Sequence, residues 1–538
     1  MSYQSFSFIL FVAIVLFFYY LLGKKRQLYV LAVANLVFYA IAGVKYIPFI
    51  FITMIATFLT GKKIGAIYEE ADKKLAMCNT PKEKKEVRTA SKAEAKKVLH
   101  VALFVSIALL GVCKYTSFTI KNINVIFNLL NIEQLEIFNM ILPLGISFYT
   151  FMALSYVLDI YWKRYKAESN FLMYAVYLSY FPHVVQGPID RFNDFKKQIE
   201  NGVALSYQNI TYGAQLALWG FFKKLVIADR LGLFVNNILD TWQQAHGLIL
   251  IAAIAVYSIQ IYTDFSGCID IVTGVSEMFG IQLKKNFNHP YFSKTMPEFW
   301  RRWHISLQEW FKDYVYYPVS TSDFMRKIKK SFKQKGNKKA EELFSSCFPI
   351  LVVWMITGIW HGASWNFVVW GLYHATLLIG SHVLEPVFNK LNQIFHVDTE
   401  NFGWYCFQML RTYILCCIGR VFFVVTSVGQ SFSILKKMVT NLSFGALMTS
   451  LHTYGSSLSE MIEGIFAMGK FDILIAIIAV GVLLIVDILQ EKMKIRETLS
   501  RQNIIFRWII IYIGLFAVIL FGIYGPGFDA TSFIYEKF

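Results

Sequence analysis

The sequence predicts an all-α, polytopic integral membrane protein, and three observations lead to that prediction. Of the 538 residues, 56% are hydrophobic and only 16% are charged, whereas about a quarter of an ordinary soluble domain is charged. The 49 Phe and 30 Tyr residues are typical of burial in a bilayer, with aromatic side chains at its interfaces. The third observation is a series of apolar stretches of about 20 residues, the length that crosses a bilayer. We therefore expect a single polytopic membrane domain over residues 1–538.

About eleven apolar stretches meet or approach the length of a transmembrane helix. Two further stretches, residues 171–186 and 212–228, are shorter and give a weaker signal. The main stretches are residues 5–22, 27–43, 47–60, 98–113, 141–161, 248–262, 346–360, 367–380, 408–426, 471–489 and 505–524.

Positive charge beside these stretches predicts how the chain crosses the membrane. Lys24, Lys25 and Arg26 follow the first stretch, and an excess of such residues marks cytoplasmic loops. Because no basic residues precede this stretch and no small-residue cleavage site follows it, we interpret it as a retained helix rather than a signal peptide. Segment 61–97 would then also be cytoplasmic, and its excess of Lys and Arg agrees with that orientation.

The net charge of +17 does not indicate a nucleic-acid-binding protein, because the positive residues gather in loops beside apolar segments, where they face anionic lipid. The strongest basic tract is RKIKKSFKQKGNKK, residues 326–339. It has two interpretations. One is an orientation signal with lipid contact, and the other is a docking patch for an acidic carrier protein or a nucleotide-containing donor.

Several classes of chemistry lack their motifs. The sequence has no Walker A pattern, no GxGxxG at the end of a strand and no GxSxG elbow, so ATP-driven transport and serine hydrolase chemistry are not expected. The seven Cys residues are scattered through apolar runs and are interpreted as buried hydrophobic residues. His289, His304, His361 and His374 lack the spacing of metal ligands, so no metal site is predicted.

Ionisable residues inside membrane segments are costly and are therefore functional candidates. In SYFPHVVQGPIDRFNDFKKQI, residues 179–199, two prolines and a glycine break the helix around Asp190. This aspartate either faces a cavity or forms a local ion pair. In QIYTDFSGCIDIVTGVSEMFG, residues 260–280, Asp264 is more consistent with a structural carboxylate than with a catalytic one.

Two further stretches carry histidines. His304 lies in a Trp- and Arg-rich stretch, residues 286–319, which suggests an interfacial helix but contains more Pro, His and Asp than such a helix needs. His361 lies in the apolar segment 355–380, before Gly362. A neutral imidazole in an apolar pocket can act as a general base, although an interhelical hydrogen-bond role is the alternative. His374 lies thirteen residues later on another helical face, and we expect it to be structural.

Taken together, five segments resemble the membrane-bound O-acyltransferase (MBOAT) family, in particular the bacterial branch that includes the alginate O-acetyltransferase membrane subunit. They occur in the family's order over residues of about 140–385, the region assigned to the catalytic core motifs, and residues 390–538 form a C-terminal helical extension. The segments are FPHVVQGPIDRF, GFFKKLVIADRL, QIYTDFSGCIDI, NFNHPYFSKTMPEFWRRWHISLQEWFKDYVYYPV and TGIWHGASWNFVVWGLYHA.

The resemblance implies an MBOAT fold of about eleven transmembrane helices, with re-entrant and interfacial helices, around a central tunnel. It implies that His361 of the WHG motif is the catalytic base and that His304 of the WRRWH motif is the second catalytic histidine. No cofactor would be bound. The donor would be a thioester reached from the cytoplasm, either acetyl-CoA or an acyl carrier protein, and the acceptor would be a hydroxyl group, often on the other side.

From the resemblance we expect an enzyme of the bacterial cytoplasmic membrane that acylates, and most simply acetylates, an extracytoplasmic polysaccharide, directly or through a secreted partner. D-alanyl transfer for teichoic acid modification is the alternative within the family, and a transporter or scramblase is the alternative of another class. Substrate contacts are expected from five residues, while Asp190 and Asp264 are expected to hold the core together. The five are Trp300, Arg302, Trp303, Trp360 and Asn366.

Overall fold

The computed structural model describes residues 1–138 and 140–524. Within these ranges every extended regular element is a helix, and β pairing is limited to one isolated bridge between Phe287 and Trp303. Seven helical segments of the described residues are long and apolar enough to cross a membrane, or eight if the bent pair Trp365–Val383 and Glu385–Ile394 forms one span. The predicted all-α class is therefore confirmed.

This number of spans is smaller than the eleven stretches expected from hydropathy, for two reasons: two apolar helices are short, and two stretches fall within one segment. The helices Phe6–Leu21 and Ile146–Tyr161 are apolar but have only 16 residues each, which is short for a bilayer crossing of about 20 residues. In addition, the apolar segment Lys24–Met77 joins two expected stretches. It contains a break at Gly43, whose φ of 147° separates two helices.

The contacts within the chain divide into two compact units, one of residues 1–214 and 272–284 and the other of residues 215–271 and 285–538. Two helices, α8 (Tyr207–Phe221) and α10 (Gly247–Met278), contribute residues to both units. The other helices of the first unit are α1 (Phe6–Leu21), α2 (Gln27–Gly43), α3 (Ile47–Met77), α4 (Pro81–Leu129), α5 (Ile146–Tyr161), α6 (Phe171–Ser179) and α7 (Phe192–Ile199).

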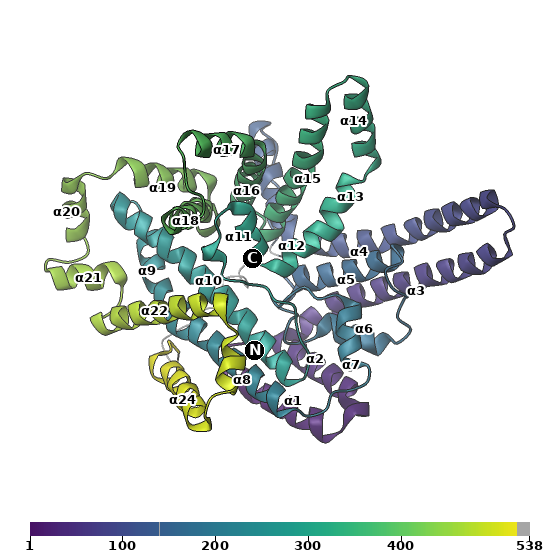
Figure 1. Ribbon diagram of the computed structural model, residues 1–538, viewed down its shortest axis with the longest axis horizontal. Coiled ribbons are helices and arrows are strands. Elements are labelled where there is room, and N and C mark those ends of the chain that lie inside the picture. Colours follow the sequence, from purple (N-terminus) through teal and green to yellow (C-terminus); the bar gives the residue numbers. More distant parts are fainter. Residues whose placement is uncertain (139, 525–538) are drawn as a thin grey trace. The chain divides into compact units, whose positions relative to one another are not determined.

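In the first unit, α3 and α4 form a long hairpin whose charged ends extend away from the other helices of that unit (Figure 1). The capping box of Thr80 and Glu83 starts α4 immediately after the turn. Helix α5 is buried on almost every face, and it lies close to α3 because Gly61 has no Cβ, which would come within 2.7 Å of the Tyr156 ring.

The second unit contains the two histidines predicted to be catalytic. A π-helix, Phe222–Ala228, precedes α9, and such irregular turns occur frequently at functional sites. The further helices are α9 (Asp229–Asp240), α11 (Met296–Arg302), α12 (Ile305–Phe311), α13 (Tyr317–Ser320), α14 (Asp323–Gln334), α15 (Lys338–His361), α16 (Trp365–Val383), α17 (Glu385–Ile394), α18 (Phe402–Val424), α19 (Val428–Thr440), α20 (Phe444–His452), α21 (Leu458–Phe466), α22 (Lys470–Lys492), α23 (Ile495–Ser500) and α24 (Ile504–Phe521).

Helices α15 and α16 pack closely because two glycines face each other. A Cβ on Gly358 would come within 2.4 Å of the Phe367 carbonyl oxygen, and a Cβ on Gly371 within 2.4 Å of the Trp354 carbonyl oxygen. Small residues that let backbones approach are a common basis of helix packing in membranes. The WHG motif ends α15 at this contact, so the glycine pair sets the position of His361 relative to α16.

Candidate active site

A short antiparallel hairpin, residues 286–305, carries the first predicted catalytic histidine. Its two limbs meet at the bridge between Phe287 and Trp303. Next to the bridge, the Asn288 amide donates a hydrogen bond to the Arg302 carbonyl oxygen at 2.9 Å. Helix α11 forms the connection between the limbs, and it ends because the chain becomes extended at Trp303 (φ −107°, ψ 126°). The hairpin therefore presents the histidine immediately after this extended residue.

Asn286 holds the chain around His304. Its carbonyl oxygen accepts a hydrogen bond from the Ile305 amide at 2.9 Å, and its Oδ1 accepts one from the Ser306 amide at 3.0 Å. The same Oδ1 lies 3.4 Å from Nδ1 of His304. The backbone of His304 is left-handed (φ 49°, ψ 52°), a conformation that His adopts more readily than most non-glycine residues. One amide side chain thus contacts both the turn and the imidazole.

His304 is buried, with 1% of its surface exposed, and its ring contacts Phe265 edge-on with centroids 4.8 Å apart. Burial disfavours the charged form and lowers the pKa of His304 from 6.5 to about 3. The imidazole is therefore neutral at physiological pH. It can act as a hydrogen-bond partner or accept a proton transiently, but it does not form a resting cation.

His361 is the last residue of α15, at a corner where the chain turns into α16. Gly362 continues the chain in an extended conformation (φ −174°, ψ 157°), and a Cβ at this position would come within 2.2 Å of the Phe367 ring. Ser364 then caps α16 by accepting a hydrogen bond from the Asn366 amide at 3.4 Å. The glycine of the WHG motif is thus required by the space that an aromatic ring occupies.

The same indole contacts both histidines. The centroid of the Trp360 ring lies 4.8 Å from that of His361 and 6.4 Å from that of His304. Trp370 and Phe423 also contact the His361 ring edge-on, at 4.8 Å and 5.3 Å. The structure therefore brings His304 next to the adjacent residues Trp360 and His361, which lie far from it in the sequence, within an aromatic and buried environment.

His374 lies close to the His361 pocket, because both histidine rings contact Trp370. Its ring is 3% exposed and contacts Trp300 at 4.9 Å, Trp354 at 5.3 Å and Trp370 at 4.8 Å. Trp370 contacts both His374 and His361. The predicted substrate residue Trp300 thus belongs to a tryptophan cage around His374, next to the pocket of His361.

Arg420 is a residue of this region that the sequence analysis missed. It is buried in α18, and its guanidinium lies 4.4 Å from the centre of the Trp303 ring and 6.0 Å from that of Phe423. Trp303 is itself buried and was predicted to contact substrate. The signal that could have found Arg420 is a charged residue within an apolar segment, since such residues are costly in a membrane and are usually functional.

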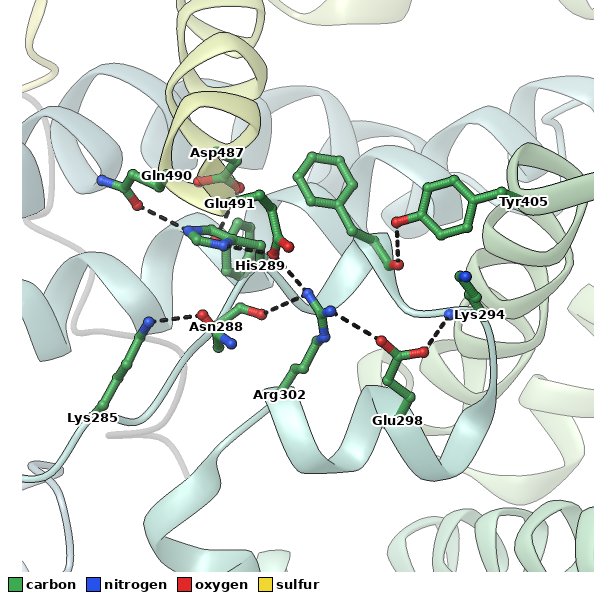
Figure 2. A network of polar contacts seen from close by, with 12 residues as sticks. Lys285, Asn288, His289, Lys294, Glu298, Arg302, Tyr405, Asp487, Gln490 and Glu491 are labelled. Carbon is green, nitrogen blue, oxygen red and sulfur yellow. Dashed lines mark hydrogen bonds and ion pairs between the residues drawn. The ribbon is translucent and has the colours of Figure 1, made fainter. Parts of the chain in front are cut away.

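Two other predicted substrate residues make polar contacts with protein groups. Arg302 forms ion pairs with Glu298 at 3.0 Å and with Glu491 at 2.7 Å, as Figure 2 shows. Asn366 donates from its side-chain amide to the Val425 carbonyl oxygen at 2.5 Å. The described contacts of Arg302 join α11 to α22, and those of Asn366 join α16 to the end of α18.

Asp264 is paired deep inside the second unit. Its carboxylate lies 2.6 Å from Nζ of Lys224, and both side chains are 2% exposed. Lys224 also contacts Asp229 at 2.7 Å, while the preceding Lys223 contacts Asp270 at 2.6 Å. Both lysines lie in the π-helix, in a motif that the sequence analysis quoted without assigning them a partner. The arrangement forms a buried network of lysines and aspartates between this helix and α10.

Asp190 belongs to the first unit. One carboxylate oxygen accepts a hydrogen bond from the Lys284 amide at 3.1 Å, and the other lies 3.5 Å from Nδ1 of His183. The Asp190 carbonyl oxygen accepts from the Tyr177 hydroxyl at 2.8 Å. Gly187 allows this compact turn, because a Cβ there would come within 2.3 Å of His183. These contacts tie the broken segment 179–199 to the chain around residue 284.

The chemistry that the second unit can support follows from its groups. Imidazoles enclosed by tryptophan and phenylalanine rings can take up and return a proton where the rings keep water away from the reacting atoms. Within residues 1–138 and 140–524, no group of three or more His, Cys, Asp or Glu side chains is arranged to hold a metal ion.

The comparisons with known proteins agree with this chemistry. Residues 166–425 match the model of the MBOAT, membrane-bound O-acyltransferase, family. This range includes His304 and His361. It leaves out α22 and α24, together with all of α3 and α4.

Relatives extend the similarity beyond the matched range. A probable alginate O-acetylase AlgI of Azotobacter vinelandii is 30% identical over 404 residues, which are 74% of this chain and 73% of the relative. A peptidoglycan O-acetyltransferase of Helicobacter pylori is 29% identical over 439 residues, 76% of this chain and 73% of the relative. A teichoic acid D-alanyltransferase of Bacillus subtilis is 29% identical over 289 residues, covering 53% of this chain and 69% of the relative.

Proposed function

Since the chain belongs to the membrane-bound O-acyltransferase family, we propose that it transfers acetyl groups from a cytoplasmic thioester donor to hydroxyl groups of a cell-surface polysaccharide. The chain is a multi-pass membrane enzyme of that family. The observation that carries the finer proposal is the similarity to two kinds of O-acetyltransferase, each over about three quarters of the chain. Both act on glycan polymers by their names, alginate in one case and peptidoglycan in the other.

In the proposed reaction His361 acts as the general base. Its imidazole takes the proton of the acceptor hydroxyl while the hydroxyl oxygen attacks the thioester carbonyl carbon. The tetrahedral intermediate then collapses, the carbon–sulfur bond breaks, and the thiolate receives the proton from the imidazolium. Atoms and charges balance with a free thiol and an acetyl ester as products. The aromatic rings around His361 support this role, because they exclude water that would otherwise hydrolyse the thioester.

His304 would contribute as a neutral partner. Its lowered pKa suits a group that donates a hydrogen bond to the developing oxyanion, or orients the acceptor, without itself carrying charge. Trp303 and Trp360 would line the path of the acyl group beside the histidines, and Trp300 would extend it toward the His374 cage. Arg302 and Asn366 would affect the substrate indirectly. Arg302 would do so by joining α11 to α22, and Asn366 by joining α16 to the end of α18.

The membrane setting accounts for the partners in the proposal. The bacterial relatives favour a location in the cytoplasmic membrane. The donor, acetyl-CoA or an acyl carrier protein, would enter from the cytoplasm. The acetyl group would then reach the polysaccharide directly or through a secreted partner. Basic residues of tract 326–339 are mostly exposed on and after α14, where they would face anionic lipid headgroups or an acidic donor.

D-alanyl transfer is the second candidate function, because the Bacillus subtilis D-alanyltransferase is similarly identical over 53% of the chain. The longer match to the O-acetyltransferases favours acetyl transfer. Membership in an acyltransferase family also favours an enzyme over a transporter or scramblase.

The test is acyl transfer by the purified protein in liposomes with a polysaccharide acceptor. The donor is either labelled acetyl-CoA or an acyl carrier protein loaded with a labelled acetyl group. We expect His361→Gln to lower kcat at least a hundredfold, within the range of about 10²–10⁴ for loss of a general base. The matched control is His100→Gln, since His100 is exposed on α4 and should leave turnover unchanged.

Two outcomes would contradict the proposal. Equal turnover of wild type and His361→Gln would remove this histidine from the mechanism. Transfer from a D-alanyl carrier protein, with no transfer from either acetyl donor, would replace acetyl by D-alanyl as the transferred group.

A further inference from the structure

Glu491 contacts both limbs of the hairpin that carries His304. Its Oε1 lies 3.0 Å from Nδ1 of His289, which follows the first limb, and 2.7 Å from the guanidinium of Arg302 on the second limb. Figure 2 shows this carboxylate, on α22, between the two side chains. A single oxygen thus lies within hydrogen-bond distance of His289, which precedes α11, and of Arg302, the last residue of α11.

The neighbouring contacts strengthen this junction. Gln490 places its Oε1 2.9 Å from Nε2 of His289, so both ring nitrogens are held by α22. Arg302 also pairs with Glu298 at 3.0 Å, which fixes the guanidinium between two carboxylates. Hydrogen bonds to charged groups are the stronger ones, and the planar guanidinium suits such paired contacts.

The junction lies close to the histidine in sequence and in structure. Arg302 precedes His304 by two residues, and its carbonyl oxygen accepts from the Asn288 amide across the hairpin. Asn286 then holds the turn at His304 from the opposite limb. If the limbs separate, the two oxygens of Asn286 move away from the His304 ring and from the backbone amides of Ile305 and Ser306. The contact between limbs therefore determines where the His304 ring sits against Trp360.

Helix α22 lies outside residues 166–425, the range that matches the family. It is one of the helices that are long and apolar enough to cross a membrane, and anchoring is the simplest role for such a helix. We propose instead that Glu491 is a positioning residue, which clamps the two limbs of the hairpin and thereby fixes His304 for acyl transfer. This inference rests on the proposed function for its catalytic consequence, but the clamp itself is a property of the fold.

The experiment compares two carboxylates at the two ends of α22. Glu491→Ala removes the clamp. Asp472→Ala removes the ion pair of α22 with Arg230 in α9, whose atoms are 3.0 Å apart, and leaves the hairpin contacts in place. Both side chains are partly exposed, at 36% and 46%, so the two variants are matched in chemistry and surroundings.

The first measurement is hydrogen exchange of the peptide that covers residues 286–305, in the full-length protein in lipid nanodiscs. We expect the amides of Asn288 and Ile305 to exchange at least ten times faster in Glu491→Ala than in wild type or Asp472→Ala. Unchanged exchange in Glu491→Ala, or equal acceleration in both variants, would overturn the clamp. This measurement does not depend on any acyl transfer.

The second measurement is steady-state acyl transfer. We expect Glu491→Ala to lower kcat at least tenfold, with KM for the donor within twofold of wild type. Glu491→Gln keeps an acceptor oxygen and should recover part of kcat, whereas Asp472→Ala should retain it. A loosened hairpin with unchanged kcat would overturn the positioning role. Absence of acyl transfer in wild type would count against the proposed function, and exchange would still decide whether the clamp exists.

Discussion

The two buried histidines are held in their positions by different means. His361 stands at a helix corner that depends on glycine: Gly358 brings α15 against α16, and Gly362 leaves room for the Phe367 ring. His304 stands on a hairpin that depends on polar contacts, which come from Asn286 on one limb. One environment is set by shape and the other by hydrogen bonds and charge.

This difference predicts different sensitivities. A site held by close packing tolerates changes of charge in its surroundings but not added volume, because a closely packed interior cannot expand locally at low cost. A site held by hydrogen bonds tolerates modest changes of shape, but the loss of one partner leaves a buried polar group unsatisfied. Three experiments test whether the two histidines divide in this way.

The largest effect is expected from added volume at the corner. Gly358→Ala places a Cβ within 2.4 Å of the Phe367 carbonyl oxygen, so the helices must separate. We expect it to lower the free energy of unfolding by about 3 kcal/mol, at the upper end of overpacking. Gly380→Ala on α16 is the control, since nothing lies within 4 Å of its added Cβ, and it should stabilise by about 0.5–1 kcal/mol. Denaturant unfolding in detergent measures both, and equal effects would remove the packing argument.

The second effect concerns acid. Burial lowers the pKa of His304 from 6.5 to about 3, so between these values the unfolded chain binds a proton that the folded protein does not. The free energy of unfolding should therefore fall as the pH drops below 6.5, by up to about 1.4 kcal/mol per pH unit and about 2 kcal/mol at pH 5.

Unfolding of wild type and His304→Gln at pH 7 and pH 5 tests this pH dependence. The variant should lose this component of the acid sensitivity, and its retention in full would show that other groups cause it. Well above pH 6.5, His304 contributes no pH dependence, because it is neutral in both the folded and the unfolded state.

The smallest effect is expected from the amide that holds the hairpin. Asn286→Ala removes the acceptor for the Ser306 amide and the contact with Nδ1 of His304, and should cost about 1 kcal/mol in free energy of unfolding. Asn288→Ala is the matched control, because its side chain contacts Lys285 at 2.7 Å in an exposed position. We expect acyl transfer to fall in the first variant and to persist in the second, and the reverse result would show that the comparison is wrong.

Much of the architecture could be predicted from the sequence. Apolar runs beside basic loops indicated a helical membrane protein, because composition directly reflects the solvent that a surface meets. The resemblance of WRRWH and WHGASWN to family motifs selected His304 and His361, and both lie in contact with Trp360. These predictions depend on local patterns, which a sequence displays directly.

Other features depend on contacts between distant residues and could not be predicted. Asn286 lies eighteen positions before His304, and nothing in its own surroundings marks it as the partner of an imidazole. Arg302 was expected at the substrate, yet its ion pairs lead to glutamates, one of them on α22. The number of spans also differed, because hydropathy measures how apolar a stretch is, whereas a crossing also requires a helix of sufficient length, which Phe6–Leu21 and Ile146–Tyr161 lack.

The hairpin of α3 and α4 has a practical consequence for imaging this protein. Its turn at residues 78–80 joins a helix of 31 residues to one of 49 residues, and the capping box at Thr80 ends the turn sharply. A small helical domain could be inserted at this turn so that its terminal helices continue α3 and α4. Two continuous helices would then hold the domain in a fixed orientation. For a particle otherwise hidden in a micelle, such a fiducial would provide the asymmetric feature that image alignment requires.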